Sequence, residues 1–500
     1  MTAVRSEPIP PARPSQTAEP TPAVDLESVL DAAQRAAAPL AALRPAERAR
    51  LLDAVAAALD AAAGELVPVA QAETHLPEGR LRGELKRTTF QLRLFGEFLR
   101  DGGYLDARID HADAEWPMGA PRPDLRRVRV PLGPVVVFAA SNFPFAFSVA
   151  GGDTASALAA GCPVLLKAHS GHLGLSRLTA EVVAAALAEA GAPEGTFALL
   201  VGTEAGAAAL RDPRVAAGAF TGSIPGGRAL FDIASSRPVP IPFYGELGSN
   251  NPVFVTEAAA AGRGAEIAAG FVGSFTLGAG QFCTKPGTLV VPARSGLVGE
   301  LRRSALPPAA QLLNERIQAG YAGVLEGLAA HPRIEVLVQG PDPLADPPSP
   351  TLLLTTAADM LADPHALQAE CFGPTAVVVT YDDESQLAPL AESFEGQLTA
   401  TIHGTESCDV AGLVEVLSRK AGRVLWNQWP TGVSVTYAQQ HGGPYPATTS
   451  VTSTSVGTAA IDRFLRPVAY QGFPQHLLPE ALRDANPLGV PRLVDGAREE

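Results

Sequence analysis

The feature that most constrains the fold is a repeated change from short apolar runs to helical runs between Pro134 and Ser235. Four of the apolar runs have the length and composition of buried strands, and they are Val135–Ala139, Pro163–Lys167, Phe197–Val201 and Ala217–Thr221. Small-residue helices are expected at Val149–Gly161, Leu175–Ala190 and Ala229–Ser235. This alternation predicts an α/β fold with a doubly wound, mostly parallel sheet.

The regions on either side of this sheet extend the predicted architecture. Residues Val24 to Arg100 have helical periodicity, and Asp101-Gly102-Gly103 is expected to end the last of these helices. His111 to Val130 is polar and contains prolines, which favours an extended arm. Further strands and helices are predicted beyond Asn251, with strands at Asn251–Val255, Thr288–Val291, Ile334–Val338, Leu352–Thr355, Ala376–Tyr381 and Gly422–Trp426.

Composition excludes several classes of protein. The chain has 500 residues and a net charge of −14, which argues against a nucleic-acid binder. No apolar run is long enough to span a bilayer, and residues 1–24 lack the apolar core of a secretory signal, so we expect a disordered tail and a cytoplasmic protein. The four cysteines are widely spaced and no CxxC or HExxH spacing is present, so neither disulfides nor a metal site is expected.

Three separated residues carry a set of groups suited to covalent chemistry on a carbonyl. Cys283 follows a glycine-rich approach at the end of an apolar helical run, Glu246 lies in Tyr244-Gly245-Glu246-Leu247-Gly248, and Asn142 precedes Phe143-Pro144. A thiol, a carboxylate and an amide supply a nucleophile, a general base and an oxyanion donor. The apolar neighbours of Glu246 predict a raised pKa. The alternatives are a buried inert cysteine, a strand-terminal glutamate and a turn asparagine.

Five short motifs, taken in order, resemble the aldehyde dehydrogenase superfamily over roughly Leu26 to Pro474. They are Ser141-Asn142-Phe143-Pro144, Phe220-Thr221-Gly222-Ser223 with Gly227, Glu246-Leu247-Gly248, Gly280-Gln281-Phe282-Cys283 and Glu370-Cys371-Phe372-Gly373-Pro374. Lys167–His172 and Arg463–Val468 resemble an NADP-dependent branch, which includes 2-oxoglutarate semialdehyde (2,5-dioxovalerate) and bacterial fatty aldehyde dehydrogenases.

The resemblance implies two Rossmann-like domains and a bridging β arm that makes a homodimer or homotetramer. The expected boundaries are 25–110 and 132–245 for the cofactor-binding domain and 246–435 for the catalytic domain. Residues 111–131 and 475–500 are expected to form the arm and C-terminal segment, and 436–474 to return to the cofactor domain.

The resemblance also implies roles for residues in a coenzyme site. Gly222, Ser223 and Gly227 lie between a strand and a helix, where glycine allows a close approach of the pyrophosphate, although a tight turn explains them equally well. Glu370 and Phe372 match the residues that hold the nicotinamide ribose and flank its ring. Ser170 stands where NAD-preferring relatives have glutamate, and with Lys167 it favours NADP while leaving NAD tolerated.

The implied reaction is oxidation of an aldehyde to a carboxylic acid through a thiohemiacetal and a thioester. Glu246 argues against transfer of the acyl group to coenzyme A. The best candidate substrate is 2-oxoglutarate semialdehyde, with medium- or long-chain fatty aldehydes next. Phe143 and Phe147 are expected to line the tunnel, and Arg93, like Arg87, is a candidate for the substrate carboxylate.

Two further points stay open in the sequence. A catalytically silent relative that acts as a binding protein is the alternative from another class. Ser249-Asn250-Asn251 and His441-Gly442-Gly443-Pro444 also depart from the wider family pattern, in which glycine and lysine follow Glu-Leu-Gly and Pro-Phe-Gly-Gly stands near the end.

Overall fold

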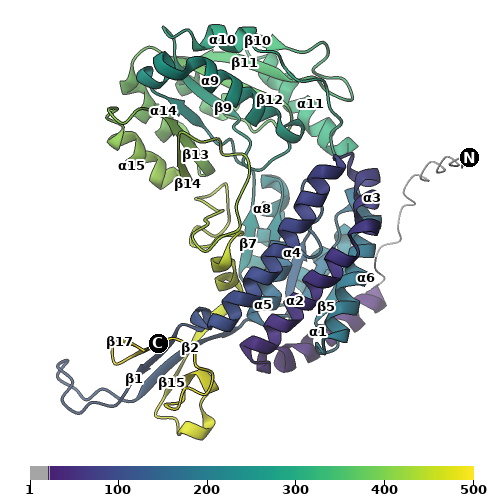
Figure 1. Ribbon diagram of the computed structural model, residues 1–500, viewed down its shortest axis with the longest axis vertical. Coiled ribbons are helices and arrows are strands. Elements are labelled where there is room, and N and C mark those ends of the chain that lie inside the picture. The colour runs from purple at the N-terminus through teal and green to yellow at the C-terminus, as the bar shows by residue number, and fades with distance from the viewer. Residues whose placement is uncertain (1–20, 22, 500) are drawn as a thin grey trace, which may run out of the picture.

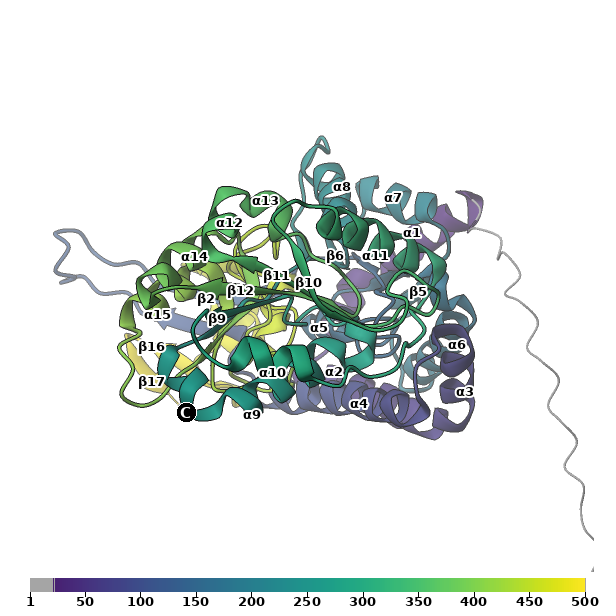
Figure 2. The same ribbon diagram turned by 90° about the horizontal axis from the view of Figure 1, so that it is seen from above.

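The computed structural model describes residue 21 and residues 23–499, so most of the predicted tail, 1–24, lies outside the described residues. The described strands form three sheets of five, seven and five strands. Figure 1 shows two lobes with an arm that extends below them, and the loop between the first two strands projects from one side in both Figure 1 and Figure 2. This arrangement agrees with the predicted α/β fold.

The first sheet contains the four strands that the alternating pattern predicted and a fifth, β7, which was not predicted. Its five strands are parallel, in the order β5-β4-β3-β6-β7. Their bounds are β3 (Val135–Phe138), β4 (Val164–Lys167), β5 (Phe197–Leu200), β6 (Ala217–Thr221) and β7 (Phe243–Glu246). The strand order reverses between β3 and β6, and ligands of open α/β sheets bind at such a switch point, beyond the carboxyl ends of the strands.

Helices cover both faces of this sheet and bury its apolar side chains. They are α1 (Ala23–Ala42), α2 (Pro45–Ala61), α3 (Ala63–Thr74), α4 (Glu78–Asp101), α5 (Gly152–Ala160), α6 (Leu173–Glu189), α7 (Thr203–Arg211) and α8 (Ile224–Ser235). Gly102 ends α4 with a φ of 78°, as its position predicts. Helix α8 begins earlier than the predicted Ala229, because Ser223 caps its first turn and Pro225 is compatible with that turn.

The second sheet has the order β10-β11-β12-β9-β8-β13-β14 and is parallel except for β10. Its strands are β8 (Val253–Val255), β9 (Thr288–Pro292), β10 (Glu335–Gln339), β11 (Thr351–Thr356), β12 (Thr375–Tyr381), β13 (Gln397–His403) and β14 (Ala421–Trp426). The helices around it are α9 (Glu257–Thr276), α10 (Leu297–Arg303), α11 (Glu315–Ala329), α12 (Ala357–Ala362), α13 (Pro364–Leu367), α14 (Leu387–Ser393) and α15 (Ala411–Lys420).

The third sheet forms the arm. Its order is β15-β2-β1-β16-β17, with β1 (Ala107–Asp110), β2 (Leu125–Pro131), β15 (Leu465–Gln471), β16 (Arg492–Val494) and β17 (Ala497–Glu499). No strand was predicted beyond Gly472, where frequent prolines favoured loops, yet β16 and β17 extend this sheet. Strand β15 lies within 436–474 but pairs with β2, so that segment contributes to the arm as well.

Short 3-10 helices occupy several connections between these elements. They are η1 (Gly103–Leu105), η2 (Ser170–His172), η3 (Leu277–Gly280), η4 (Glu384–Gln386), η5 (Thr458–Phe464), η6 (Gln475–Leu477) and η7 (Glu480–Leu482). Among the described helices, none combines the length and apolar character needed to cross a membrane.

Candidate active site

The loop that carries Cys283 has a backbone that few residues can adopt. Gly280 has a φ of 69°, and a Cβ atom at this position would come within 2.0 Å of the carbonyl oxygen of Gly373. Glycine is therefore required immediately before Gln281-Phe282-Cys283. The fully buried Asn251 donates from Nδ2 to the carbonyl oxygens of Cys283 at 2.8 Å and Lys285 at 2.9 Å. These two hydrogen bonds hold the backbone of the loop that carries the thiol.

Glu246 is the last residue of β7, at the carboxyl edge of the first sheet. A chain segment from near the C-terminus lies alongside it, because Leu247 N–H donates to the Ala447 carbonyl at 2.8 Å and Thr449 N–H donates to the Gly245 carbonyl at 3.0 Å. This pairing places His441 beside Glu246. The site is therefore assembled from three segments that are distant in the sequence.

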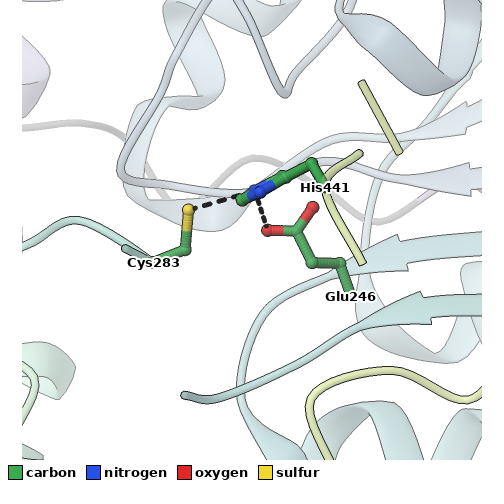
Figure 3. A group of neighbouring side chains, drawn as sticks. All are labelled: Glu246, Cys283 and His441. Carbon is green, nitrogen blue, oxygen red and sulfur yellow. Dashed lines mark hydrogen bonds and ion pairs between the residues drawn. The ribbon is translucent and has the colours of Figure 1, made fainter. Parts of the chain in front are cut away.

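The side chains of Cys283, His441 and Glu246 converge, with the imidazole between the other two (Figure 3). His441 Nε2 lies 3.5 Å from Cys283 Sγ and 2.8 Å from Glu246 Oε1. Ser455 Oγ donates to the other carboxylate oxygen of Glu246. His441 and Glu246 are 1% and 3% exposed, so solvent screens this group weakly. The contact between Nε2 and Oε1 requires a proton that one of the two residues carries.

Burial and charge set the protonation of these groups. Burial raises the pKa of the Cys283 thiol well above its ordinary value, and the nearby Glu246 carboxylate raises it further. Burial also acts to raise the pKa of Glu246, but the facing His441 ring and the Ser455 hydroxyl lower it below its ordinary value. The raised pKa predicted for Glu246 from its apolar neighbours is therefore wrong, since these polar partners were not visible in the sequence.

Asn142 and the predicted tunnel aromatics lie around the cysteine loop. Asn142 is buried, and its Nδ2 donates to the Gln281 carbonyl at 3.2 Å, two residues before Cys283. The rings of Phe143 and Phe147 are 5.5 Å apart between centroids, and that of Phe147 lies 6.3 Å from the ring of His441. This wall also includes Phe282, whose ring is 5.2 Å from that of Phe143.

The two arginines considered for a substrate carboxylate lie in different surroundings. Arg93 projects to the surface and forms an ion pair of 2.7 Å with Asp60, so the structure does not bring it to the cysteine. Arg87, on the same helix α4, stacks 5.5 Å from the Phe147 ring centre and donates from Nε to the Val433 carbonyl at 3.4 Å. Burial lowers the pKa of Arg87, while Glu84, Cys283 and Glu246 act in the opposite direction. Arg87 is thus one of two cations beside the aromatic wall, and the other is Arg80, whose guanidinium lies 5.2 Å and 4.8 Å from the ring centres of Phe143 and Phe282.

Five of the predicted coenzyme residues lie at the carboxyl edge of the first sheet, and they are Lys167, Ser170, Gly222, Ser223 and Gly227. Ser223 caps α8, and a Cβ at Gly227 would come within 2.0 Å of Leu247 Cδ2, so glycine permits close packing of helix on strand. Gly222 N–H donates to the Glu246 carbonyl at 3.0 Å, which links this loop to the active site. The open N-terminus of a helix on a glycine-containing turn fits a dinucleotide pyrophosphate.

Lys167 and Ser170 lie where the adenine ribose is expected. Lys167 ends β4, and no ion pair to it occurs among the described residues. Ser170 is exposed at the start of η2. Arg316, on the first turn of α11, lies close enough that its charge lowers the pKa values of Lys167 and His169, although burial is the larger cause for both. Unpaired cations with no facing carboxylate fit a 2′-phosphate.

Glu370 lies against the turn that follows β7, close to Ile224 at the start of α8. Its Oε2 packs against Gly248, where a Cβ would come within 2.2 Å of this oxygen. Burial raises the pKa of Glu370 to about 7, and Lys285 opposes this shift. Phe372 is half-buried in the same loop. This loop is bound to the cysteine loop through Lys285 Nζ, which donates to the Cys371 carbonyl at 2.6 Å.

His441 and Ser455 were not among the predicted site residues. The one sequence signal for His441 was that it is a histidine in a segment that departs from the wider family pattern. Nothing in the sequence around Ser455 distinguishes it from its serine and threonine neighbours.

Comparisons with known proteins agree on one family. A model described as "Aldehyde dehydrogenase family" matches residues 7–300. The chain is 48% identical to "Alpha-ketoglutaric semialdehyde dehydrogenase 2" of Azospirillum brasilense, covering 91% of this chain and 88% of that protein. It is 46% identical to "Alpha-ketoglutaric semialdehyde dehydrogenase" of Acinetobacter baylyi, covering 90% of this chain and 87% of the relative.

Solved structures share the fold. An NAD-dependent aldehyde dehydrogenase from Sinorhizobium meliloti is similar with a TM-score of 0.74 and 24% identity, over 91% of this chain and 88% of that one. An NADP-dependent enzyme from E. coli is similar with a TM-score of 0.74 and 23% identity, over 90% of both chains. The protein therefore belongs to the aldehyde dehydrogenase family.

Proposed function

We propose that this aldehyde dehydrogenase oxidises 2-oxoglutarate semialdehyde to 2-oxoglutarate with NADP as its coenzyme. The observation that supports this chemistry is the convergence of three side chains. Cys283 Sγ lies 3.5 Å from His441 Nε2, and His441 Nε2 lies 2.8 Å from Glu246 Oε1. The substrate is supported by the resemblance in sequence to the two relatives that carry this name.

The raised pKa of Cys283 means that the resting thiol needs a base. The Glu246–His441 pair lies within reach of Sγ and takes the thiol proton, after which the thiolate attacks the aldehyde carbon. Asn142 Nδ2, which points to the cysteine loop, and the Cys283 N–H stabilise the oxyanion of the thiohemiacetal. NADP, when bound, accepts the hydride that this species loses.

Loss of hydride leaves a thioester on Cys283, which water must cleave. The depressed pKa of Glu246 keeps its carboxylate ionised at neutral pH, so it accepts a proton from the attacking water. His441 shares that proton through its 2.8 Å contact. Sulfur is released and becomes a thiol again as the carboxylic acid leaves.

Arg87 is the residue we propose for the distal carboxylate of the substrate. Its Nε is occupied by the Val433 carbonyl, whereas among the described residues no acceptor contacts its two terminal nitrogens. A guanidinium with free terminal N–H groups binds a carboxylate in a bidentate manner. A fatty aldehyde lacks this group, so the half-buried charge of Arg87 favours the dicarboxylic semialdehyde over the fatty aldehyde alternative.

NADP preference follows from Lys167 and Arg316, which lie near Ser170 with no acidic residue at that position. A carboxylate there would repel a 2′-phosphate. We also propose a homodimer or homotetramer formed through the arm, and a reducing, cytoplasmic setting.

The Glu246→Gln variant tests this mechanism directly. Mixed with NADP and the semialdehyde, it should release a burst of about one equivalent of reduced coenzyme per active site and then turn over about 100-fold more slowly, because the thioester is formed but not hydrolysed. Steady turnover at the wild-type rate would contradict the role of Glu246. Added coenzyme A should not restore the turnover of the variant and should not alter the rate of the wild type. Wild-type protein that reduces no coenzyme with any aldehyde would indicate a catalytically silent relative.

A further inference from the structure

Cys283, His441 and Glu246 together present one sulfur, one nitrogen and one oxygen donor. All three donor atoms lie within 4.8 Å of one another. Thiolate, imidazole and carboxylate are the ligands that zinc binds in proteins. The absence of CxxC and HExxH spacing excludes only ligand sets that are close in the sequence, whereas this set is assembled from three distant segments.

The separations of these atoms can be compared with those that a zinc ion imposes. In a tetrahedral site, the known bond lengths place sulfur and nitrogen ligands about 3.5 Å apart, and nitrogen and oxygen ligands about 3.3 Å apart. Cys283 Sγ and His441 Nε2 are 3.5 Å apart, which already fits. His441 Nε2 and Glu246 Oε1 are 2.8 Å apart, so this pair needs to open by about half an ångström.

The surroundings hold these ligands from the outside, as in established metal sites. Ser455 Oγ donates a hydrogen bond to Glu246 Oε2, and Glu246 Oε1 faces the imidazole. Thr454 Oγ1 accepts a hydrogen bond from the His441 backbone N–H at 2.8 Å and so holds the backbone of His441 in place. Zinc replaces the thiol proton and the proton shared by Nε2 and Oε1, and so it relieves the repulsion between a thiolate and the buried carboxylate.

We propose that Cys283 Sγ, His441 Nε2 and Glu246 Oε1 bind one zinc ion, or another thiophilic divalent cation, in a manner that blocks the enzyme. Binding forms three bonds to the metal and releases protons to solvent, with no change of oxidation state. A water molecule completes the tetrahedron. The bound ion removes the nucleophile and the base together, whichever aldehyde is the substrate, so this inference does not depend on the identity of that aldehyde.

Cobalt(II) is the probe for this site, because a cobalt–thiolate bond gives a charge-transfer absorption that reports sulfur ligation directly. Chelator-treated full-length protein without coenzyme should develop this band with one equivalent of Co²⁺, and Zn²⁺ should displace it. Cys408→Ser, which removes the other partly exposed thiol, should keep the band. Cys283→Ser should lose it, and His441→Gln and Glu246→Gln should each bind Co²⁺ at least about tenfold more weakly, since each lacks one ligand.

Activity gives a second readout in the wild type. Zn²⁺ should inhibit turnover at the concentrations that displace Co²⁺, and EDTA should restore it. Melting curves establish that each variant is folded before its spectrum is compared. A band that survives in Cys283→Ser, or equal Co²⁺ affinity in wild type, His441→Gln and Glu246→Gln, overturns the proposal. So does wild-type protein that shows no thiolate band at all.

Discussion

At the scale of single residues, the identity of the nucleophile and the state of its proton are separate questions. The motif around Cys283 identifies the residue, but the buried carboxylate of Glu246 and the low polarity of the site hold its pKa well above the ordinary range. His441 Nε2 lies 3.5 Å from Sγ and 2.8 Å from Glu246 Oε1, so the imidazole links the thiol to the carboxylate of the pair that takes its proton. The residue that departs from the wider family pattern is thus the one in contact with the nucleophile.

The raised pKa of Cys283 predicts how fast its thiol is alkylated. In coenzyme-free protein the rate with iodoacetamide should keep rising with pH beyond 9, because only the thiolate reacts and the pKa of Cys283 in the folded protein lies well above that of an ordinary cysteine. Glu246→Gln removes the negative charge that helps to raise this pKa, so its whole profile should shift to lower pH. A shift of one unit is a tenfold faster reaction at neutral pH.

This measurement needs a background without Cys408, whose pKa is lowered by hydrogen bonds from Thr256 and Thr405. The comparison is therefore between Cys408→Ser and the same chain with Glu246→Gln added. Slower alkylation after loss of the carboxylate would show that the role of Glu246 as a base for the thiol outweighs its effect on the pKa of Cys283.

Arg87→Met should impair turnover of a dicarboxylic semialdehyde but not that of an uncharged aldehyde of similar length. Loss of a charge-assisted contact to the substrate carboxylate is expected to lower kcat/KM by about 10- to 100-fold, or roughly 2 kcal/mol. Arg93→Met is the matched control, since it lies on the same helix but pairs with Asp60 at the surface. Equal losses for both aldehydes would mean that Arg87 has a structural role only.

At the scale of elements, buried polar side chains bind the loops of the active site to one another. Lys285 is 3% exposed, and its Nζ donates to the carbonyl oxygens of Cys371 at 2.6 Å and Thr375 at 2.7 Å. Asn251, with a φ of 56°, joins the connection between β7 and β8 to the same cysteine loop. The departures at Ser249-Asn250-Asn251 therefore replace the usual sequence with a network that holds the nucleophile in place.

Lys285→Met tests this connection. The substitution leaves buried carbonyl oxygens without their donor, so we expect it to destabilise the protein by about 2–4 kcal/mol. Burial raises the pKa of Glu370 to about 7, and the charge of Lys285 opposes this rise. Loss of that charge should therefore raise the pKa of Glu370 further. Thermal unfolding measures the first effect, and Lys420→Met, at an exposed ion pair with Glu392, is the control. An unchanged melting temperature would show that the two loops do not depend on Lys285.

At the scale of the whole molecule, the seven-stranded sheet ends in an unprotected strand. Strand β14 has no partner on its outer side among the described residues, and Val424 and Trp426 on it are 38% and 42% exposed. Open edges of this kind pair with other strands. A second copy of the chain, which also presents the arm sheet, is the partner that we propose for this edge.

Val424→Lys should reduce the oligomeric mass measured by light scattering, because a lysine at the centre of an edge strand opposes strand pairing. Val239→Lys, at another exposed apolar position, is the control and should leave the mass unchanged. Wild-type protein that is already a monomer would contradict the proposed oligomer, whereas a variant of unchanged mass would contradict only the choice of this edge.

The sequence by itself determined the α/β fold and the location of the nucleophile. Buried strands such as Val135–Phe138 are recognisable in the local sequence as apolar runs. Cys283 lies in a motif that includes Gly280, and no other residue can replace this glycine without a backbone clash. The short strands β16 and β17 were missed because β16 is stabilised by pairing with β1, and β17 by pairing with β16, which local composition does not report.

Only the tertiary structure decided how the site is protonated and which charges face the substrate. Arg87 and Arg93 are equivalent in the sequence, but the packing of α4 turns one to Phe147 and the other to Asp60. His441 reaches Glu246 and Cys283 because a segment near the C-terminus pairs beside β7. Contacts between distant segments set the pKa values and the pocket, since electrostatic forces depend on separation in space and not along the chain.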